Sequence, residues 1–189
     1  GEMPIGPCGN TTAGVFTRCH SASVVTLARS EPRSHFTLGI VDDVTHRSLP
    51  WDASFQTEGE GVSSAVFYGL AADGTVGANK NTIKILGQET PLHVQGYFVY
   101  DSKKSRAITV SHLRSSPGPI RSAYLVDRAG FVACHQFEFV DKIDVLEHAA
   151  PGAVFLLNAP FPAEAVWDHL PREMQQQMVD KSVRFFTID

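Results

Sequence analysis

The chain has 189 residues, of which 43% are hydrophobic and 19% charged, and its formal net charge is −4. This length and composition are typical of one globular domain, or two at most, with a sizeable core. The acidic balance argues against nonspecific binding to nucleic acid, which needs a basic surface. The longest apolar runs are strand-length, far short of the roughly 20 residues of a membrane helix, so we expect neither a nucleic-acid nor a membrane partner.

Three cysteines, Cys8, Cys19 and Cys134, are scattered along the chain and form no CxxC pair. Their spacing predicts neither a disulfide framework nor a complete zinc or iron–sulfur site. A reducing cytoplasm fits this usage best. The chain begins at Gly1 without a methionine and stops in a strand-like segment, VRFFTI, so we expect a piece of a larger protein.

The amino-acid composition of the chain changes near residue 35. Residues 1–34 are punctuated by Gly, Pro, Ser and Thr, which predicts a linker or the tail of a preceding domain, with one short helix at 23–29. HFTLGIV (35–41) predicts the first core strand of a domain that runs over 35–189. SAVFYGL (64–70) predicts a buried strand, and DGTVGANKNTIKIL (73–86) predicts a glycine turn followed by an amphipathic helix.

The second half of the chain predicts a hairpin and then alternating strands and helices. VQGYFVY (94–100) and RAITVSHL (106–113) are separated by the short polar segment DSKKS, so they should be antiparallel neighbours. Further strands are predicted at 122–126, 131–134, 153–157 and 183–188, and helices at 140–149, 163–170 and 172–181. We therefore predict an α/β fold: a three-layer α/β/α domain on a mixed sheet of about seven strands.

Ligands on such sheets usually bind at the carboxyl ends of the strands. Polar residues fall there in three segments: Asp42 to Thr45, the loop at 73–81, and Asn158. The first segment suggests a divalent ion or an acid/base pair, but adjacent aspartates on a strand point to opposite faces, and DDVT also makes a good turn. We therefore predict no metal site. We also predict no catalytic residue, because Cys134 followed by His135 is more typical of a core thiol than of a nucleophile.

The 73–81 loop is the strongest candidate for an anion site. Gly74 and Gly77 allow a tight turn and let backbone N–H groups approach a ligand. Thr75 can cap the helix, and Lys80, followed by Asn81, lies one turn in, where its ammonium can reach a phosphate. The spacing matches neither GxGxxG nor the phosphate loop, so a plain glycine turn with a solvated lysine is the alternative.

A second cationic segment is TVSHLRSSPGPIR (109–121). Strand alternation puts Ser111 and Leu113 on one face, with His112 and Arg114 on the other. Arg114 and Arg121 lie on either side of the Pro and Gly bend. Such a pair could bind a phosphate or carboxylate, and it could equally form a contact between domains. We predict that Lys80 and Arg114 face the same cleft at the strand ends.

Taken together, several segments resemble the γ-type domain of pyruvate:ferredoxin (flavodoxin) oxidoreductases, in the order of that family. The segments are FTLGIVDDVTHRSLP (36–50), DGTVGANKNTIKILG (73–87), GYFVYDSKKS (96–105), TVSHLR (109–114), FVACH (131–135) and FLLNAPF (155–161). The resemblance covers the chain from about His35 to its end. It departs at Ala71, where a glycine is usual, and residues 1–33 do not match.

The resemblance implies an internal domain of a large, homodimeric enzyme that oxidatively decarboxylates pyruvate to acetyl-CoA. Such enzymes use thiamine diphosphate with Mg, and they pass electrons through [4Fe–4S] clusters to ferredoxin or flavodoxin. Those cofactor sites lie in other domains, so the isolated domain should be inactive. Related 2-oxoacid oxidoreductases share the γ-type fold, but VDDVTHRSL and VYDSKKS look most like the single-chain pyruvate type; a fusion with an NADP-reducing module remains open.

Within that family the γ-type domain is associated with coenzyme A. The resemblance therefore suggests CoA contacts from the polar segments, namely Thr45, Thr75, Gly77, Lys80, Asn81, Arg114 and Asn158. A purely structural module that bridges the other domains is the alternative. Either role predicts an exposed apolar patch where neighbouring domains would dock.

Overall fold

The structure is a computed structural model that describes residues 30–31, 35–38, 40, 42–49, 58–100 and 108–188. The chain divides into two compact units, Gly1–Glu58 with Ser122–Leu125, and Gly59–Arg121 with Val126–Asp189. The predicted helix at 23–29 and the DSKKS connection lie outside the described residues. The predicted domain boundary at residue 34 stays a prediction.

In the first unit, β1 (Thr37–Leu38) pairs in parallel with β2 (Ser48–Leu49) in a sheet of its own. The Asp43 carboxylate closes the turn between them, because it accepts hydrogen bonds from the backbone N–H of Thr45 (3.0 Å) and of Ser48. The prediction that HFTLGIV forms the first strand of the core sheet is therefore wrong. Its residues Thr37 and Leu38 pair with β2 in the separate two-stranded sheet instead.

The second unit contains a mixed sheet of six strands among the described residues, in the order β4-β5-β3-β6-β7-β8. The strands are β3 (Ser63–Leu70), β4 (His93–Tyr100), β5 (Ile108–Ser116), β6 (Ala129–Cys134), β7 (Ala149–Asn158) and β8 (Arg184–Ile188). β5 is antiparallel to both of its neighbours, β3 and β4, whereas β3, β6, β7 and β8 pair in parallel. The predicted antiparallel pairing of the two hairpin strands is confirmed, but residues 122–126 form no strand.

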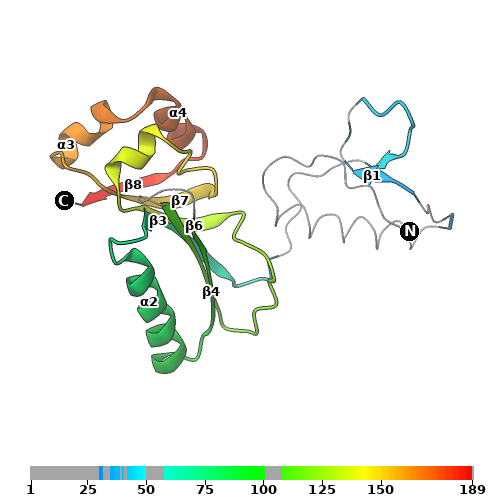
Figure 1. Ribbon diagram of the computed structural model, residues 1–189, viewed down its shortest axis with the longest axis horizontal. Coiled ribbons are helices and arrows are strands. Elements are labelled where there is room, and N and C mark those ends of the chain that lie inside the picture. The colour runs from blue at the N-terminus through cyan, green and yellow to red at the C-terminus, as the bar shows by residue number, and fades with distance from the viewer. Residues whose placement is uncertain are drawn as a thin grey trace. The chain divides into compact units, whose positions relative to one another are not determined.

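Helices cover both faces of this sheet, which confirms the α/β fold class (Figure 1). α2 (Thr75–Glu89) lies on one face, and α3 (Ala163–Val166) and α4 (Arg172–Asp180) lie on the other. Two 3₁₀ helices, η1 (Phe137–Asp141) and η2 (Trp167–His169), complete the helical elements of the described residues. No helix in this described part is long and apolar enough to cross a membrane.

The helix predicted at 140–149 is wrong, although its apolar residues are buried as expected. η1 ends at Asp141, and turns follow it. The Asp144 side chain accepts a hydrogen bond from the Leu146 backbone N–H at 3.1 Å, which offers the backbone a local alternative to the helical bond. Val145 and Leu146 are still only 2% and 0% exposed.

The main core lies between the sheet and the layer of α3 and α4. Residues that alternate along the strands, such as Val66, Val132, Phe155 and Leu157, face this layer and are completely buried. The helices supply a matching apolar set: Val166, Leu170, Met174 and Met178. We call this side of the sheet the core face, and the side that carries α2 the α2 face.

On the α2 face, α2 packs against β4, β5 and β3. Gly96 in β4 makes this approach possible, because a Cβ atom there would lie 2.2 Å from Ile83 Cδ1. The glycine removes the side chain that would keep the helix from the sheet. α2 therefore covers the half of the sheet that carries the 73–81 loop.

Candidate functional site at the strand carboxyl ends

Two of the three predicted polar segments meet at one edge of the sheet. β3, β6 and β7 are parallel neighbours, so Leu70, Cys134 and Asn158 end their strands side by side. The Gln136 amide donates to Asp73 Oδ2 (3.3 Å), and Asn158 Nδ2 donates to the carbonyl of His135 (3.2 Å). These bonds connect the loop after β3 with the ends of β6 and β7.

Asp73 organises the loop between β3 and α2. Its Oδ2 accepts the Leu70 N–H at 2.7 Å, and its Oδ1 accepts the Thr75 N–H at 2.9 Å. The N-cap of α2 is Gly74, and Thr75 is the first helical residue, so the prediction that Thr75 caps the helix is wrong. The Asp73 carboxylate therefore already occupies part of the helix N-terminus, which attracts anions.

The Asp73 carboxyl is held in its charged form. Partial burial alone would raise its pKa, but hydrogen bonds from the Leu70 backbone and from the backbone and side chain of Thr75, together with Gln136, lower the pKa below its ordinary value. The head of α2 therefore carries a fixed negative charge. This charge opposes a second anion at the same position.

The glycines around the loop have different roles. Gly74 has φ of 83°, a left-handed conformation that side chains disfavour, and Gly69 touches the loop so closely that a Cβ would lie 2.5 Å from Thr75 Oγ1. Gly77 lies inside the first turn of α2, and a Cβ there would meet nothing within 4 Å. The turn therefore needs Gly69 and Gly74, whereas Gly77 leaves an open approach to the first helical turn.

Lys80 and Asn81 are exposed on α2, one turn beyond the loop. The Lys80 ammonium lies 5.3 Å from the centroid of the Phe98 ring in β4, a cation–π contact. The amines of exposed lysines stay hydrated and keep freedom to reach a ligand. The Lys80 side chain therefore extends towards β4, on the other side of β3 from β6 and β7.

Arg114 lies elsewhere, so the prediction of a shared cleft with Lys80 is wrong. β5 runs antiparallel to β3, and Arg114 pairs with Ser64, whereas Leu70 at the loop pairs with Ile108. Six register positions separate the two levels, about 20 Å along a strand. Arg114 also lies on the core face, is only 2% exposed, and donates to Gln95 Oε1 at 3.3 Å.

His112 shares this buried environment with Arg114, as strand alternation predicts. It is 3% exposed, and its ring makes an edge contact with His148 at 5.8 Å between centroids. Burial, and then the electrostatic interactions with His148 and Arg114, lower the pKa of His112 to about 4. The residue is therefore a neutral core histidine at physiological pH.

A layer of polar side chains lies between α2 and the sheet. Asn79 Nδ2, Thr109 Oγ1 and Ser111 Oγ are buried and form no hydrogen bond within the protein. Thr109 and Ser111 lie on the α2 face of β5, and Asn79 follows Thr75 by one helical turn. Buried polar atoms normally have partners, and His112 Nδ1 on the core face is likewise buried without one.

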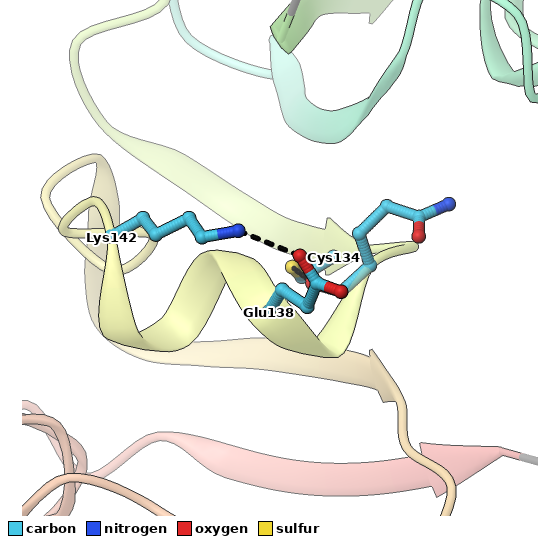
Figure 2. A network of polar contacts seen from close by, with 4 residues as sticks. Cys134, Glu138 and Lys142 are labelled. Carbon is cyan, nitrogen blue, oxygen red and sulfur yellow. Dashed lines mark hydrogen bonds and ion pairs between the residues drawn. The ribbon is translucent and has the colours of Figure 1, made fainter. Parts of the chain in front are cut away.

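Cys134 does not have the surroundings of a nucleophile. Its side chain is buried beside η1, and burial raises the pKa of the thiol to about 12, so it stays protonated. Its Sγ donates to the carbonyl of Gln136 at 3.2 Å. The nearby Glu138 and Lys142 form an ion pair of 2.6 Å on the surface of η1 (Figure 2); exposed pairs of this kind contribute little to stability.

Thr45 belongs to the first unit, where its hydroxyl donates to Asp43 Oδ1 at 2.5 Å. That hydrogen bond, with those of neighbouring backbone groups, lowers the pKa of Asp43. The segment forms the turn that DDVT also predicted. Across the described ranges, no group of three or more His, Cys, Asp and Glu side chains could hold a metal ion.

The sequence reasoning missed Asp73 and Gln136, the two side chains that join the loop to the neighbouring strand end. Aspartate shortly before a helix is a common signal of helix capping, and the ADGT segment contains it. Gln136 gave no local signal, because only the parallel pairing of β3 and β6 brings it near Asp73.

Comparison with known proteins identifies the family. Residues 64–189 match the family described as pyruvate ferredoxin/flavodoxin oxidoreductase. The chain is 58% identical over 163 residues to the pyruvate-flavodoxin oxidoreductase of Rhodospirillum rubrum, which covers 86% of this chain and 14% of the relative. It is 48% identical over 163 residues to the pyruvate:ferredoxin oxidoreductase of Moorella thermoacetica, with the same coverage.

The chain therefore spans about one seventh of the length of these relatives. Among solved structures, the pyruvate oxidoreductase subunit PORC of Thermotoga maritima aligns with a TM-score of 0.46 and 14% identity, over 58% of this chain and 56% of that one. The assignment rests on the sequence matches, which confirm the predicted resemblance. The chain belongs to the pyruvate ferredoxin/flavodoxin oxidoreductase family.

Proposed function

We propose that this chain is the γ-type domain of an enzyme that oxidises pyruvate and CoA to acetyl-CoA and CO₂ and transfers two electrons to flavodoxin or ferredoxin. The observation that supports this most is the 58% identity to a pyruvate-flavodoxin oxidoreductase over 86% of the chain. Thiamine diphosphate, Mg and [4Fe–4S] clusters belong to other parts of the enzyme, which is a cytoplasmic homodimer in this proposal.

The full-length protein tests this proposal directly. With thiamine diphosphate and Mg²⁺ present, it should reduce flavodoxin or ferredoxin when both pyruvate and CoA are added. 2-Oxoglutarate and branched-chain oxoacids should be poor substrates. A preference for one of these oxoacids over pyruvate would contradict the proposed substrate.

Within this enzyme, the domain contributes contacts to CoA at the carboxyl edge of its sheet. The first helical turn of α2 has N–H groups without intrahelical partners, Gly77 leaves the approach to them open, and Asn158 ends a neighbouring strand. Because Asp73 opposes a phosphate at the helix start, the amides of the pantetheine arm fit that position better. Lys80, with Asn81 beside it, lies farther along α2, where an ammonium can meet a CoA phosphate.

Lys80→Ala in the full-length enzyme tests this contact. The Michaelis constant for CoA should rise roughly tenfold, the scale of one charge-assisted hydrogen bond of about 1.5 kcal/mol. The constant for pyruvate should stay unchanged. Lys84→Ala is the matched control, because Lys84 is also exposed on α2 but lies one turn farther from the loop.

A purely structural role for the domain is the second candidate, and Asp73 favours it. The carboxylate already satisfies N–H groups that a ligand would use, so the loop is stable without one. If Lys80→Ala and Lys84→Ala enzymes show the same CoA dependence as the unmodified enzyme, the structural role replaces the CoA contact.

A further inference from the structure

The α2 face of the sheet is apolar where α2 does not pack on it. Five large apolar side chains lie in this region, and we call them the open half-face: Phe131 in β6, Val154 and Leu156 in β7, and Phe186 and Ile188 in β8. Strand register aligns Phe131 with Val154, and Leu156 with Phe186. The five residues therefore form one continuous surface across three neighbouring strands.

The outer part of this surface is strongly exposed. Phe186 and Ile188 are 55% and 56% exposed, whereas Phe185, also in β8, packs against the core and stacks on Phe155 at 5.6 Å. An edge strand that presents two large apolar side chains to water invites association. The contrast between adjacent phenylalanines shows that β8 has apolar residues for both of its faces.

Polar residues border the open half-face at both ends of the strands. Arg184 lies on the same face of β8 and is exposed at its start, and Asn158 pairs with Ile188 at its end. An apolar centre with a polar rim is the usual anatomy of a protein interface. The surface is therefore built like a docking site.

The relatives indicate what covers it. The matched segment makes up only 14% of their length, so most of the polypeptide in this family lies outside the domain. Contacts between domains of one protein typically bury about 600–1,500 Å². We propose that the open half-face docks on an apolar surface of another domain or subunit of the same oxidoreductase. The proposal depends on family membership and is independent of the CoA contact.

Photocrosslinking in the full-length protein tests the docking. The variant Phe186→p-benzoylphenylalanine is irradiated, and the crosslinked peptides are identified by mass spectrometry. The expected partners lie in the oxidoreductase outside residues 1–189. Val179→p-benzoylphenylalanine is the comparison for nonspecific reaction, because Val179 is 63% exposed on α4, across the sheet. Crosslinks only to residues 1–58, or only to the same face of a second copy, would overturn the proposal.

Hydroxyl-radical footprinting of the unmodified full-length protein keeps the test decisive if the crosslinker disturbs folding. Phe186 should be oxidised at least about tenfold more slowly in the native protein than after unfolding in urea, because a docked surface excludes solvent. Native oxidation within about twofold of the unfolded rate would show an uncovered surface and reject the docking.

Discussion

The two faces of one sheet differ in how completely their apolar side chains are covered. On the core face, Val132, Phe155 and Leu157 are fully buried against an apolar helical layer. On the α2 face, buried polar atoms of Thr109 and Ser111 lack partners, and Phe186 is more than half exposed. The core face thus accounts for the stability of the domain, and the α2 face retains the groups that can interact with something else.

The largest expected effect compares two adjacent leucines of β7. Leu157 points into the core and is 0% exposed, whereas Leu156 lies on the open half-face. Leu157→Ala should lower the free energy of unfolding of the 189-residue chain by about 2–5 kcal/mol, because it leaves a cavity. Leu156→Ala should cost less than half as much. Equal losses in urea unfolding would contradict the difference between the faces.

Acid should weaken the core face through His112. The pKa of His112 is about 4 in the folded protein, below its ordinary value of roughly 6.5, so the unfolded chain binds more protons between these values. The contribution of His112 is constant well above pH 6.5, and it lowers the free energy of unfolding by about 3 kcal/mol as the pH drops towards 4. Urea unfolding of the 189-residue chain against pH measures this slope.

His112→Gln should remove that part of the acid sensitivity, and His93→Gln, at an exposed position of β4, should retain it. The same pH dependence in all three proteins would show that His112 is not its source.

A smaller effect separates the two glycines near the α2 loop. Gly69→Ala should destabilise the 189-residue chain by about 1–3 kcal/mol, because the new Cβ would clash with Thr75 at 2.5 Å. Gly77→Ala should stabilise it by up to about 1 kcal/mol, because alanine favours the helix and the position is open. Thermal unfolding of both variants checks the opposite signs. A stable Gly69→Ala protein would show that the loop can move away from β3.

Local patterns predicted the elements better than their positions. Alternation correctly placed His112 and Arg114 on one face, and the short polar connection predicted the antiparallel hairpin. The position of Arg114 along the sheet depends on long-range register. Because β5 is antiparallel to β3, the end of β5 that carries Arg114 lies at the start of β3, away from its carboxyl end. Asn158 was placed correctly at the loop edge, because parallel strands bring their carboxyl ends together.

Three of the incorrect predictions share a different cause, which is competition from local hydrogen bonds. Asp43 forms a turn after the first predicted strand, and Asp144 replaces a helical bond at Leu146. Gly74 is the N-cap in place of Thr75, and Asp73 accepts the hydrogen bond of the Thr75 N–H. Each aspartate was visible in the sequence, but whether its side chain would bond to nearby backbone depended on the surrounding fold.

The central claim is that this chain supports an oxidoreductase without carrying its chemistry. The most direct measurement compares the 189-residue chain with the full-length protein in an assay with pyruvate, CoA, thiamine diphosphate, Mg²⁺ and a viologen dye. We predict dye reduction by the full-length protein and none above background by the chain alone. Turnover by the chain alone, or no pyruvate-dependent reduction by the full-length protein, would contradict this account.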